Sequence, residues 1–215
     1  MPDKKLKIVI ADDHPMLLQG LKDTLEKAGL NVVGAANTGS AALQLIIDHH
    51  PDLAVLDIEM PYLSGFTIAS ECQKKGLNTK FIILSYHKES EFIAQAKSLN
   101  ISGYVLKEDT SADILNCITS VMKGEPYYSR SILSKDMDTA NDSLKRLTNL
   151  SPSERKILKL IASQMSSQEI ANKLHIAERT VEKHRSNIIA KLGIHGQSHS
   201  LSMWAIKQKS MIMDL

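Results

Sequence analysis

The chain has 215 residues, with 26 Lys or Arg against 24 Asp or Glu, so its formal net charge is only +2. This length fits one domain of about 120 residues and a smaller one, each able to bury its own core. No apolar stretch is long enough to span a membrane, and the N-terminus leads into a strand pattern rather than a signal peptide, which predicts a cytoplasmic protein. Cys72 and Cys117 lack metal-ligand spacing and are expected to be buried thiols, not a disulfide.

Charge is distributed unevenly along the chain. Residues 1–124 hold 12 Lys or Arg against 15 Asp or Glu, whereas residues 151–215 hold 10 against 5, a net charge of +5. The intervening segment is polar and poor in periodic apolar residues. It predicts a linker over residues 125–147, with a short helical turn near residues 144–147. The sequence thus predicts three parts: a first domain over 5–124, the linker, and a basic domain over 148–215.

Four short apolar runs in the first domain each end at a polar residue that can handle phosphate or metal. They are residues 7–11 before Asp12 and Asp13, 53–56 before Asp57, 81–84 before Ser85, and 104–106 before Lys107. Runs so short and so continuously apolar are typical of parallel strands buried on both faces. Ligands bind outside the carboxyl ends of such strands. The sequence therefore predicts an α/β domain with these polar groups at one rim.

These residue types suit one Mg²⁺ ion and one phosphoryl group. Mg²⁺ prefers oxygen ligands, which Asp12, Asp13 and Asp57 can supply. A carboxylate can also attack phosphorus, and Asp57 is the candidate because it stands alone after its run. Lys107 and Ser85 would then stabilise the phosphoryl oxygens. A simpler interpretation stays open for the first pair, because an acidic residue after a strand can merely cap the next helix.

Several segments of this first domain, in the right order, resemble the receiver domain of bacterial two-component response regulators. The segments are 11–15, 56–65, 84–85 and 103–107. The resemblance covers about residues 5–124. It implies a doubly wound, five-stranded parallel sheet of the flavodoxin-like type.

The resemblance also implies roles for individual residues. Asp57 would accept a phosphoryl group from a phosphohistidine of a sensor histidine kinase. The implied Mg²⁺ ligands are Asp12, Asp13, Asp57 and the backbone carbonyl of Glu59. Ser85 and Tyr104 would form a switch pair, although ordinary packing also explains a tyrosine at this place. Tyr86 replaces a residue that is usually small in the family, and we expect it to slow the reaction with small phosphodonors.

The basic domain carries the signals of a helix-turn-helix. Capping boxes at Ser151 and Ser166 begin two helices, the second of which ends at Leu174. A three-residue turn over 175–177 then leads into a longer helix over 178–192. Two helices joined by so tight a turn indicate a helix-turn-helix, whose second helix enters the major groove.

The outer face of the helix over 178–192 is the candidate DNA-reading surface, because Val181, Ile188 and Leu192 form an inward stripe. The candidate contacts to bases or phosphates are Arg179, Thr180, Glu182, Lys183, His184, Arg185, Ser186, Asn187 and Lys191. The alternative is a solvated basic face on a small helical bundle.

A second resemblance, to the LuxR-type helix-turn-helix, rests on residues 150–155, 168–171 and 180–188. Together the two resemblances imply a response regulator of the NarL type, a homodimeric transcription factor that binds double-stranded DNA and is not an enzyme. The final helix, over about 198–209, would supply much of the dimer contact. His175 and Ala177 replace residues that are commonly Gly and Ser, so a strained turn and a missing N-cap are expected.

Two other functions remain open at this point. One is a constitutive DNA-binding protein whose receiver-like domain serves only for dimerisation and is not phosphorylated. The other is a metal-dependent phosphohydrolase with Asp57 as its nucleophile, for which Glu59 would be the acid or base.

Overall fold

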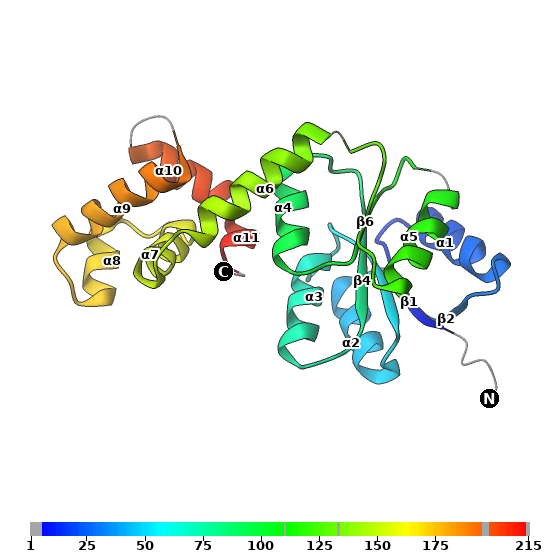
Figure 1. Ribbon diagram of the computed structural model, residues 1–215. Helices are drawn as coiled ribbons and strands as arrows, with labels where there is room; N and C mark the ends of the chain where they lie inside the picture. Colours follow the sequence, from blue (N-terminus) through cyan, green and yellow to red (C-terminus); the bar gives the residue numbers. More distant parts are fainter. Residues whose placement is uncertain (1–5, 110, 133, 195–197, 214–215) are drawn as a thin grey trace. The chain divides into compact units, whose positions relative to one another are not determined.

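The computed structural model describes residues 6–109, 111–132, 134–194 and 198–213 (Figure 1). The chain divides into two compact units, Met1–Asp136 and Met137–Leu215. The boundary between them falls inside the segment that the sequence analysis treats as a linker. In the described part of the chain, no helix is both long and apolar enough to cross a membrane.

The first unit alternates strands and helices in a doubly wound arrangement. Its elements are β1 (Lys7–Ala11), α1 (Pro15–Lys27), β2 (Asn31–Ala36), α2 (Gly39–His49), β3 (Leu53–Asp57), α3 (Gly65–Lys74), β4 (Lys80–Ser85), α4 (Ser90–Ser98), β5 (Gly103–Leu106), α5 (Ser111–Lys123) and β6 (Tyr127–Tyr128). The strands form one parallel sheet in the order β2-β1-β3-β4-β5-β6. Helices α1 and α5 cover one face, and α2, α3 and α4 cover the other (Figure 1). The predicted fold class is confirmed.

Two features differ from the sequence expectation. The sheet has six strands rather than five, because Tyr127 and Tyr128 pair with the edge strand β5. In addition, α6 (Ser134–Thr148) is a helix of 15 residues where only a short turn was expected. Met137, Ala140, Leu144 and Leu147 follow helical spacing within its polar sequence. The segment over 125–147 is therefore mostly regular structure.

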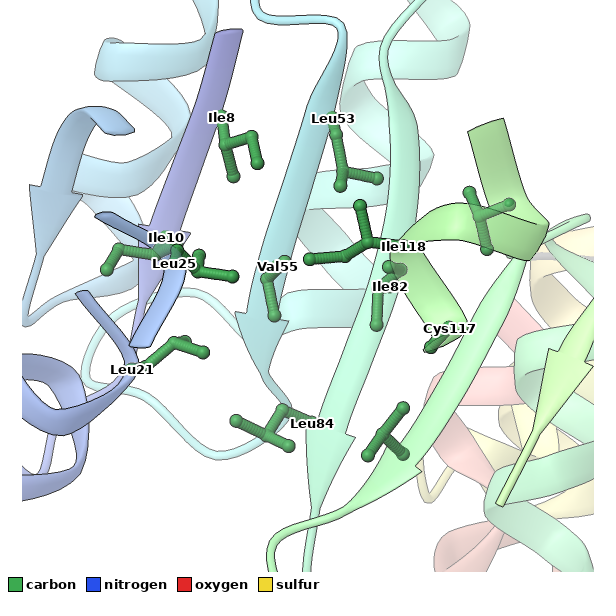
Figure 2. Close-up of a cluster of buried hydrophobic side chains, with 12 residues drawn as sticks. Ile8, Ile10, Leu21, Leu25, Leu53, Val55, Ile82, Leu84, Cys117 and Ile118 are labelled. Carbon is green, nitrogen blue, oxygen red and sulfur yellow. The ribbon is translucent and has the colours of Figure 1, made fainter. Parts of the chain in front are cut away.

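Strands β1, β3, β4 and β5 are mainly apolar because helices cover both faces of the sheet. On one face, Ile8 and Ile10 of β1 pack in a buried cluster with Leu21 and Leu25 of α1, and Cys117 of α5 belongs to the same cluster (Figure 2). Each fully buried side chain of this kind stabilises the fold by roughly 1.5–3 kcal/mol. Burial raises the pKa of the Cys117 thiol to about 12. Both cysteines are free and buried, as predicted.

The turn after β3 depends on a close backbone approach. Gly65, the first residue of α3, lies so near the carbonyl oxygen of Asp57 that a Cβ atom would collide with it. The N–H of Gly65 also donates to the carbonyl of Ile58 at 3.1 Å. A glycine at this position lets the loop fold tightly against the end of β3.

The second unit is helical. After α6 it contains α7 (Pro152–Ala162), α8 (Ser167–Leu174), α9 (Glu178–Leu192), α10 (Ser198–Lys207) and α11 (Lys209–Met213). Both predicted capping boxes are present, at Ser151 and Ser166. Val181, Ile188 and Leu192 are buried, so the predicted inward stripe of α9 is correct. The final segment forms two helices rather than the single one expected over 198–209.

Candidate functional site

The order of the strands brings the predicted polar residues to one rim. The chain winds in opposite directions from β1 and β3, and such a switch point leaves a crevice at the carboxyl ends of the strands. Asp12 directly follows β1, Asp57 ends β3, Ser85 ends β4 and Lys107 directly follows β5. All four therefore meet at the edge predicted from the sequence.

A buried ammonium group joins two of the carboxylates. The Nζ atom of Lys107 lies 2.8 Å from Oδ2 of Asp12 and 2.8 Å from Oδ2 of Asp57, with all three side chains at most 6% exposed. Burial alone would lower the pKa of Lys107, but the two carboxylates outweigh it and raise that pKa. Burial also raises the pKa of Asp57, and Lys107 opposes this shift. One positive charge thus faces two acidic groups.

A third carboxylate makes this rim suitable for a divalent cation. Asp12, Asp13, His14 and Asp57 each place one potential ligand atom within 4.8 Å of the others. Three carboxylates beside one ammonium leave excess negative charge, and hard oxygen donors suit Mg²⁺. The N-cap of α1 is His14, without a side-chain capping bond. The capping explanation for Asp13 is therefore not supported.

A small cavity lies over these groups. Its volume is about 160 Å³, and it is lined by Asp13, His14, Asp57, Glu59, Ser85, Tyr86, His87 and Lys107. The ring centre of Tyr86 lies 5.4 Å from Nζ of Lys107, and this side chain is 59% exposed. Tyr86 therefore stands at the mouth of the cavity, where a small molecule would pass it.

Ser85 and Tyr104, the expected switch pair, hold the same loop residue. The backbone N–H of His87 donates to Oγ of Ser85 at 3.0 Å, and the hydroxyl of Tyr104 donates to the carbonyl of His87 at 2.8 Å. The Tyr104 ring is fully buried, and this burial raises its pKa. A movement of either side chain would therefore change the loop between β4 and α4.

The sequence analysis did not identify His87 as a site residue. Its ring stacks on Phe92 with centroids 4.0 Å apart, and its Nε2 atom lies 3.3 Å from Oε1 of Glu59. The only sequence signal was its place two residues after Ser85. Two of its partners, Glu59 and Tyr104, lie far from it in the sequence, so the local pattern could not reveal them.

Helix α9 carries the predicted DNA-reading residues. The exposed members of the predicted set are Arg179, Thr180, Glu182, Lys183, Ser186, Asn187 and Lys191, whereas His184 is half-buried. The turn before α9 has the expected features, since His175 has φ 54° and Ala177 provides no side-chain cap. Glu182 accepts a hydrogen bond from the hydroxyl of Ser167 in α8.

Two basic residues of the predicted set have structural partners instead. Arg185 is only 7% exposed, and its Nη2 atom donates to Oγ of Ser202 in α10 at 3.0 Å. Packing against α10 therefore buries Arg185, which the sequence places among the candidate DNA contacts. Lys191 forms a 2.7 Å ion pair with Glu154 at the start of α7. This pair ties the end of α9 to α7.

Sequence models of two families match the chain. The response regulator receiver domain matches residues 8–119, and the bacterial regulatory proteins of the luxR family match residues 148–204. The chain belongs to the response regulators of the LuxR/NarL family. These regulators combine a receiver domain with a DNA-binding helix-turn-helix domain, which accounts for both units.

Individual relatives agree with this assignment. The transcriptional regulatory protein NarL of Mycobacterium tuberculosis is 31% identical over 204 residues, covering 93% of each chain. The nitrate/nitrite response regulator NarL of Escherichia coli is 30% identical and covers 94% of this chain and 95% of its own. A solved RcsB response regulator of Salmonella typhimurium has a TM-score of 0.62 at 25% identity, over 93% of this chain and 98% of that one.

The ion pair between Glu154 and Lys191 gives a test of how the DNA-binding unit is stabilised. Burial disfavours the Glu154 carboxylate, but Lys191 and the N–H of Ser151 outweigh burial and lower its pKa. We expect Glu154→Gln to reduce the free energy of unfolding of this unit by about 1.5–3 kcal/mol at pH 7, as for hydrogen bonds to charged groups. Urea unfolding followed by the fluorescence of Trp204, the only tryptophan, reports on this unit.

The dependence on pH has a defined sign. A depressed pKa stabilises the fold above the unfolded-state value, here 4.5, and this contribution is lost as the pH falls through the folded-state pKa. The difference between wild type and Glu154→Gln should therefore shrink below pH 4.5. The control is Glu169→Gln in the exposed capping box of α8, for which we expect a smaller effect. Equal effects of the two substitutions would contradict the role of the ion pair.

Proposed function

We propose that this response regulator is controlled by phosphorylation of Asp57. A sensor histidine kinase donates the phosphoryl group in a reaction that depends on Mg²⁺, and phosphorylation controls dimerisation and DNA binding by the second unit. The observation that carries this proposal is the buried contact of Lys107 with both Asp12 and Asp57 at the carboxyl ends of the strands. Transcription regulation, rather than turnover of a substrate, is the output.

Each residue has a defined part in the proposed transfer. A carboxylate oxygen of Asp57 attacks phosphorus, and the bond between phosphorus and the histidine nitrogen of the kinase breaks in line with it. Lys107 already contacts Asp57 and would pair with a phosphoryl oxygen. The Ser85 hydroxyl would donate to another oxygen. Because both side chains already stand at the rim, short movements would bring them to the phosphoryl oxygens.

The acidic rim would hold the metal. Asp12, Asp13 and Asp57, with the backbone carbonyl of Glu59, are the proposed ligands of Mg²⁺. When bound, the ion supplies charge neutralisation for the phosphoryl oxygens. The three carboxylates otherwise repel a phosphoryl group, so the acidic set alone would disfavour the reaction.

Related structures support DNA and a second copy as partners. One solved structure contains two RcsB dimers bound to two parallel DNAs, with a TM-score of 0.59 and 25% identity to this chain. By analogy we propose that this chain binds double-stranded DNA as a homodimer, with α9 in the major groove. Doubling the contacts raises affinity through effective concentration, so control of dimerisation controls occupancy.

The first test is the intact mass of the protein after incubation with Mg²⁺ and phosphoramidate. Wild type should gain the mass of one phosphoryl group, because Asp57 is the proposed acceptor. Asp57→Asn should gain none, and EDTA should prevent the adduct on wild type. No adduct on either protein would favour constitutive DNA binding with a receiver-like dimerisation domain.

Tyr86 at the cavity mouth should limit access to Asp57. We expect Tyr86→Ala to react several-fold faster than wild type with acetyl phosphate, because the ring no longer narrows the entrance. The rate of adduct formation by mass spectrometry checks this. Tyr62→Ala, which removes a ring that is 85% exposed, is the matched control. Equal rates for Tyr86→Ala and wild type would show that the ring does not obstruct the donor.

Lys183 on the exposed face of α9 should act through phosphate attraction. We expect Lys183→Ala to weaken binding to all duplexes to a similar extent and to reduce the salt slope by about 1. Fluorescence anisotropy at several salt concentrations, with a duplex selected by the wild type and with a random duplex, measures both quantities. Lys123→Ala removes the same charge from the first unit and should leave the slope unchanged. An unchanged slope for Lys183→Ala would place this residue away from DNA.

A further inference from the structure

A set of hydrogen bonds joins the end of β5 to the segment that precedes α6. We call this set the clasp; it consists of Leu106, Asp109, Ser129 and Ser131. The backbone N–H of Leu106 donates to Oγ of Ser129 at 2.9 Å and to Oδ2 of Asp109 at 3.1 Å. The hydroxyl of Ser131 donates to Oδ1 of Asp109 at 2.8 Å. Asp109 therefore bridges the two segments, and Ser129 joins them directly.

The side chain of Ser129 replaces a backbone acceptor at the end of the β-ladder between β5 and β6. The N–H of Tyr127 donates to the carbonyl of Ser102 and the N–H of Ser129 to that of Tyr104, the two-residue steps of a parallel pair. A continued ladder would pair the N–H of Leu106 with the backbone carbonyl of Ser129. That carbonyl instead accepts from Ile132 in a turn, and the side-chain Oγ takes its place.

The burial of Ser129 makes this arrangement specific. Ser129 is 3% exposed, although it lies in a segment that is polar overall. A buried hydroxyl without a hydrogen-bond partner destabilises a fold, and here the N–H of Leu106 is that partner. Replacing Ser129 with alanine removes this acceptor and also the donation from its hydroxyl to the carbonyl of Tyr104 at 3.4 Å. The hydrogen bond from the backbone N–H of Ser129 to Tyr104 remains, so the substitution removes the side-chain bonds alone.

The clasp lies beside the proposed phosphorylation site. Leu106 directly precedes Lys107, whose side chain contacts Asp12 and Asp57, and whose N–H donates to the carbonyl of Ser85 at 2.8 Å. Ser129 also donates its backbone N–H to the carbonyl of Tyr104, which is one of the two expected switch residues. A shift of Lys107 toward a phosphoryl group would act on the strand end that the clasp holds.

The other end of the same segment enters the DNA-binding unit through the chain itself. Ser131 lies three residues before the start of α6, and the later turns of α6 are anchored within the second unit. There Leu147 is 1% exposed, and Nη1 of Arg146 donates to the carbonyl of Leu192, the last residue of α9, at 3.0 Å. Helix α6 therefore begins close to the clasp in the sequence, and its last turns contact the end of α9.

We propose that Ser129 and Asp109 are positioning residues that couple the state of Lys107 to DNA binding. This inference rests on the proposed function. The equilibrium between formed and broken clasp hydrogen bonds differs between the phosphorylated and unphosphorylated chains. That difference sets how freely the segment leading into α6 can move. Coupling of this kind is reciprocal, so a change in the clasp also changes how strongly phosphorylation affects DNA affinity.

The test compares full-length variants at equal phosphoryl occupancy, which intact mass establishes after treatment with phosphoramidate and Mg²⁺. The measured quantity is the ratio of DNA affinities with and without the phosphoryl group, on a duplex selected by the wild type. Ser129→Ala and Asp109→Ala each remove two side-chain hydrogen bonds. We expect either variant to reduce this ratio by about 3- to 10-fold, a change of the size that one hydrogen bond contributes. Asp109→Asn keeps an acceptor and should retain most of the ratio. Arg130→Ala, an exposed neighbour, is the control.

Hydrogen exchange provides a second readout, because phosphorylation should change protection over 127–132 in wild type but much less in Ser129→Ala.

A merely structural role would lower both affinities together and leave their ratio unchanged, which would overturn the inference. If Ser129→Ala does not fold, Asp109→Ala decides, since it acts from outside the ladder. A wild type without any phosphorylation-dependent affinity would overturn the proposed function and this inference together. A responsive wild type with equally responsive variants would overturn the inference alone.

Discussion

The contact of Lys107 with Asp12 and Asp57 is the interaction on which the rest of the first unit depends. Three ionisable side chains are almost fully buried there, and such groups are tolerated only when they are paired. The pairing requires β1, β3 and β5 to end at the same rim, so it depends on the parallel order of the sheet. Removing the ammonium would leave two carboxylates buried side by side. The same electrostatic imbalance that makes the site costly to build would favour a bound divalent cation, as proposed above.

The segment between the predicted domains belongs to both units rather than separating them. Its first part adds β6 to the sheet and forms the clasp at the end of β5. Its later part is the anchored half of α6, which caps the carboxyl end of α9 through Arg146. A flexible spacer would transmit little, because its own freedom would absorb a shift at either end. Hydrogen bonds of Ser129 at one end and of Arg146 at the other restrict that freedom, which is what the proposed coupling requires.

The sequence revealed those parts of the molecule whose causes are local. Continuous apolar runs located four buried strands, polar residues at the strand ends located the site, and two capping boxes located α7 and α8. Strand β2 is mostly half-exposed and contains Gly34, so it carried no comparable signal. Strand β6 has only two residues and forms because β5 offers an open edge. Arg185 is of a residue type that commonly contacts DNA, and only the packing of α10 shows that its guanidinium faces the interior.

The placement of the basic residues bears on why dimerisation would matter. The second unit has an excess of five positive charges over 151–215, but Arg185 is buried against Ser202 and Lys191 is paired with Glu154. Glu182 adds a negative charge to the exposed face of α9, where Ser167 holds it. Because affinity for DNA rises with the number of phosphates that cations neutralise, one unit with this face should bind weakly. Two units on one duplex bind far more strongly than either alone, since the second contact is effectively intramolecular. A weakly basic face of this kind would therefore make binding depend on pairing, and a signal that controls pairing would then control occupancy of DNA.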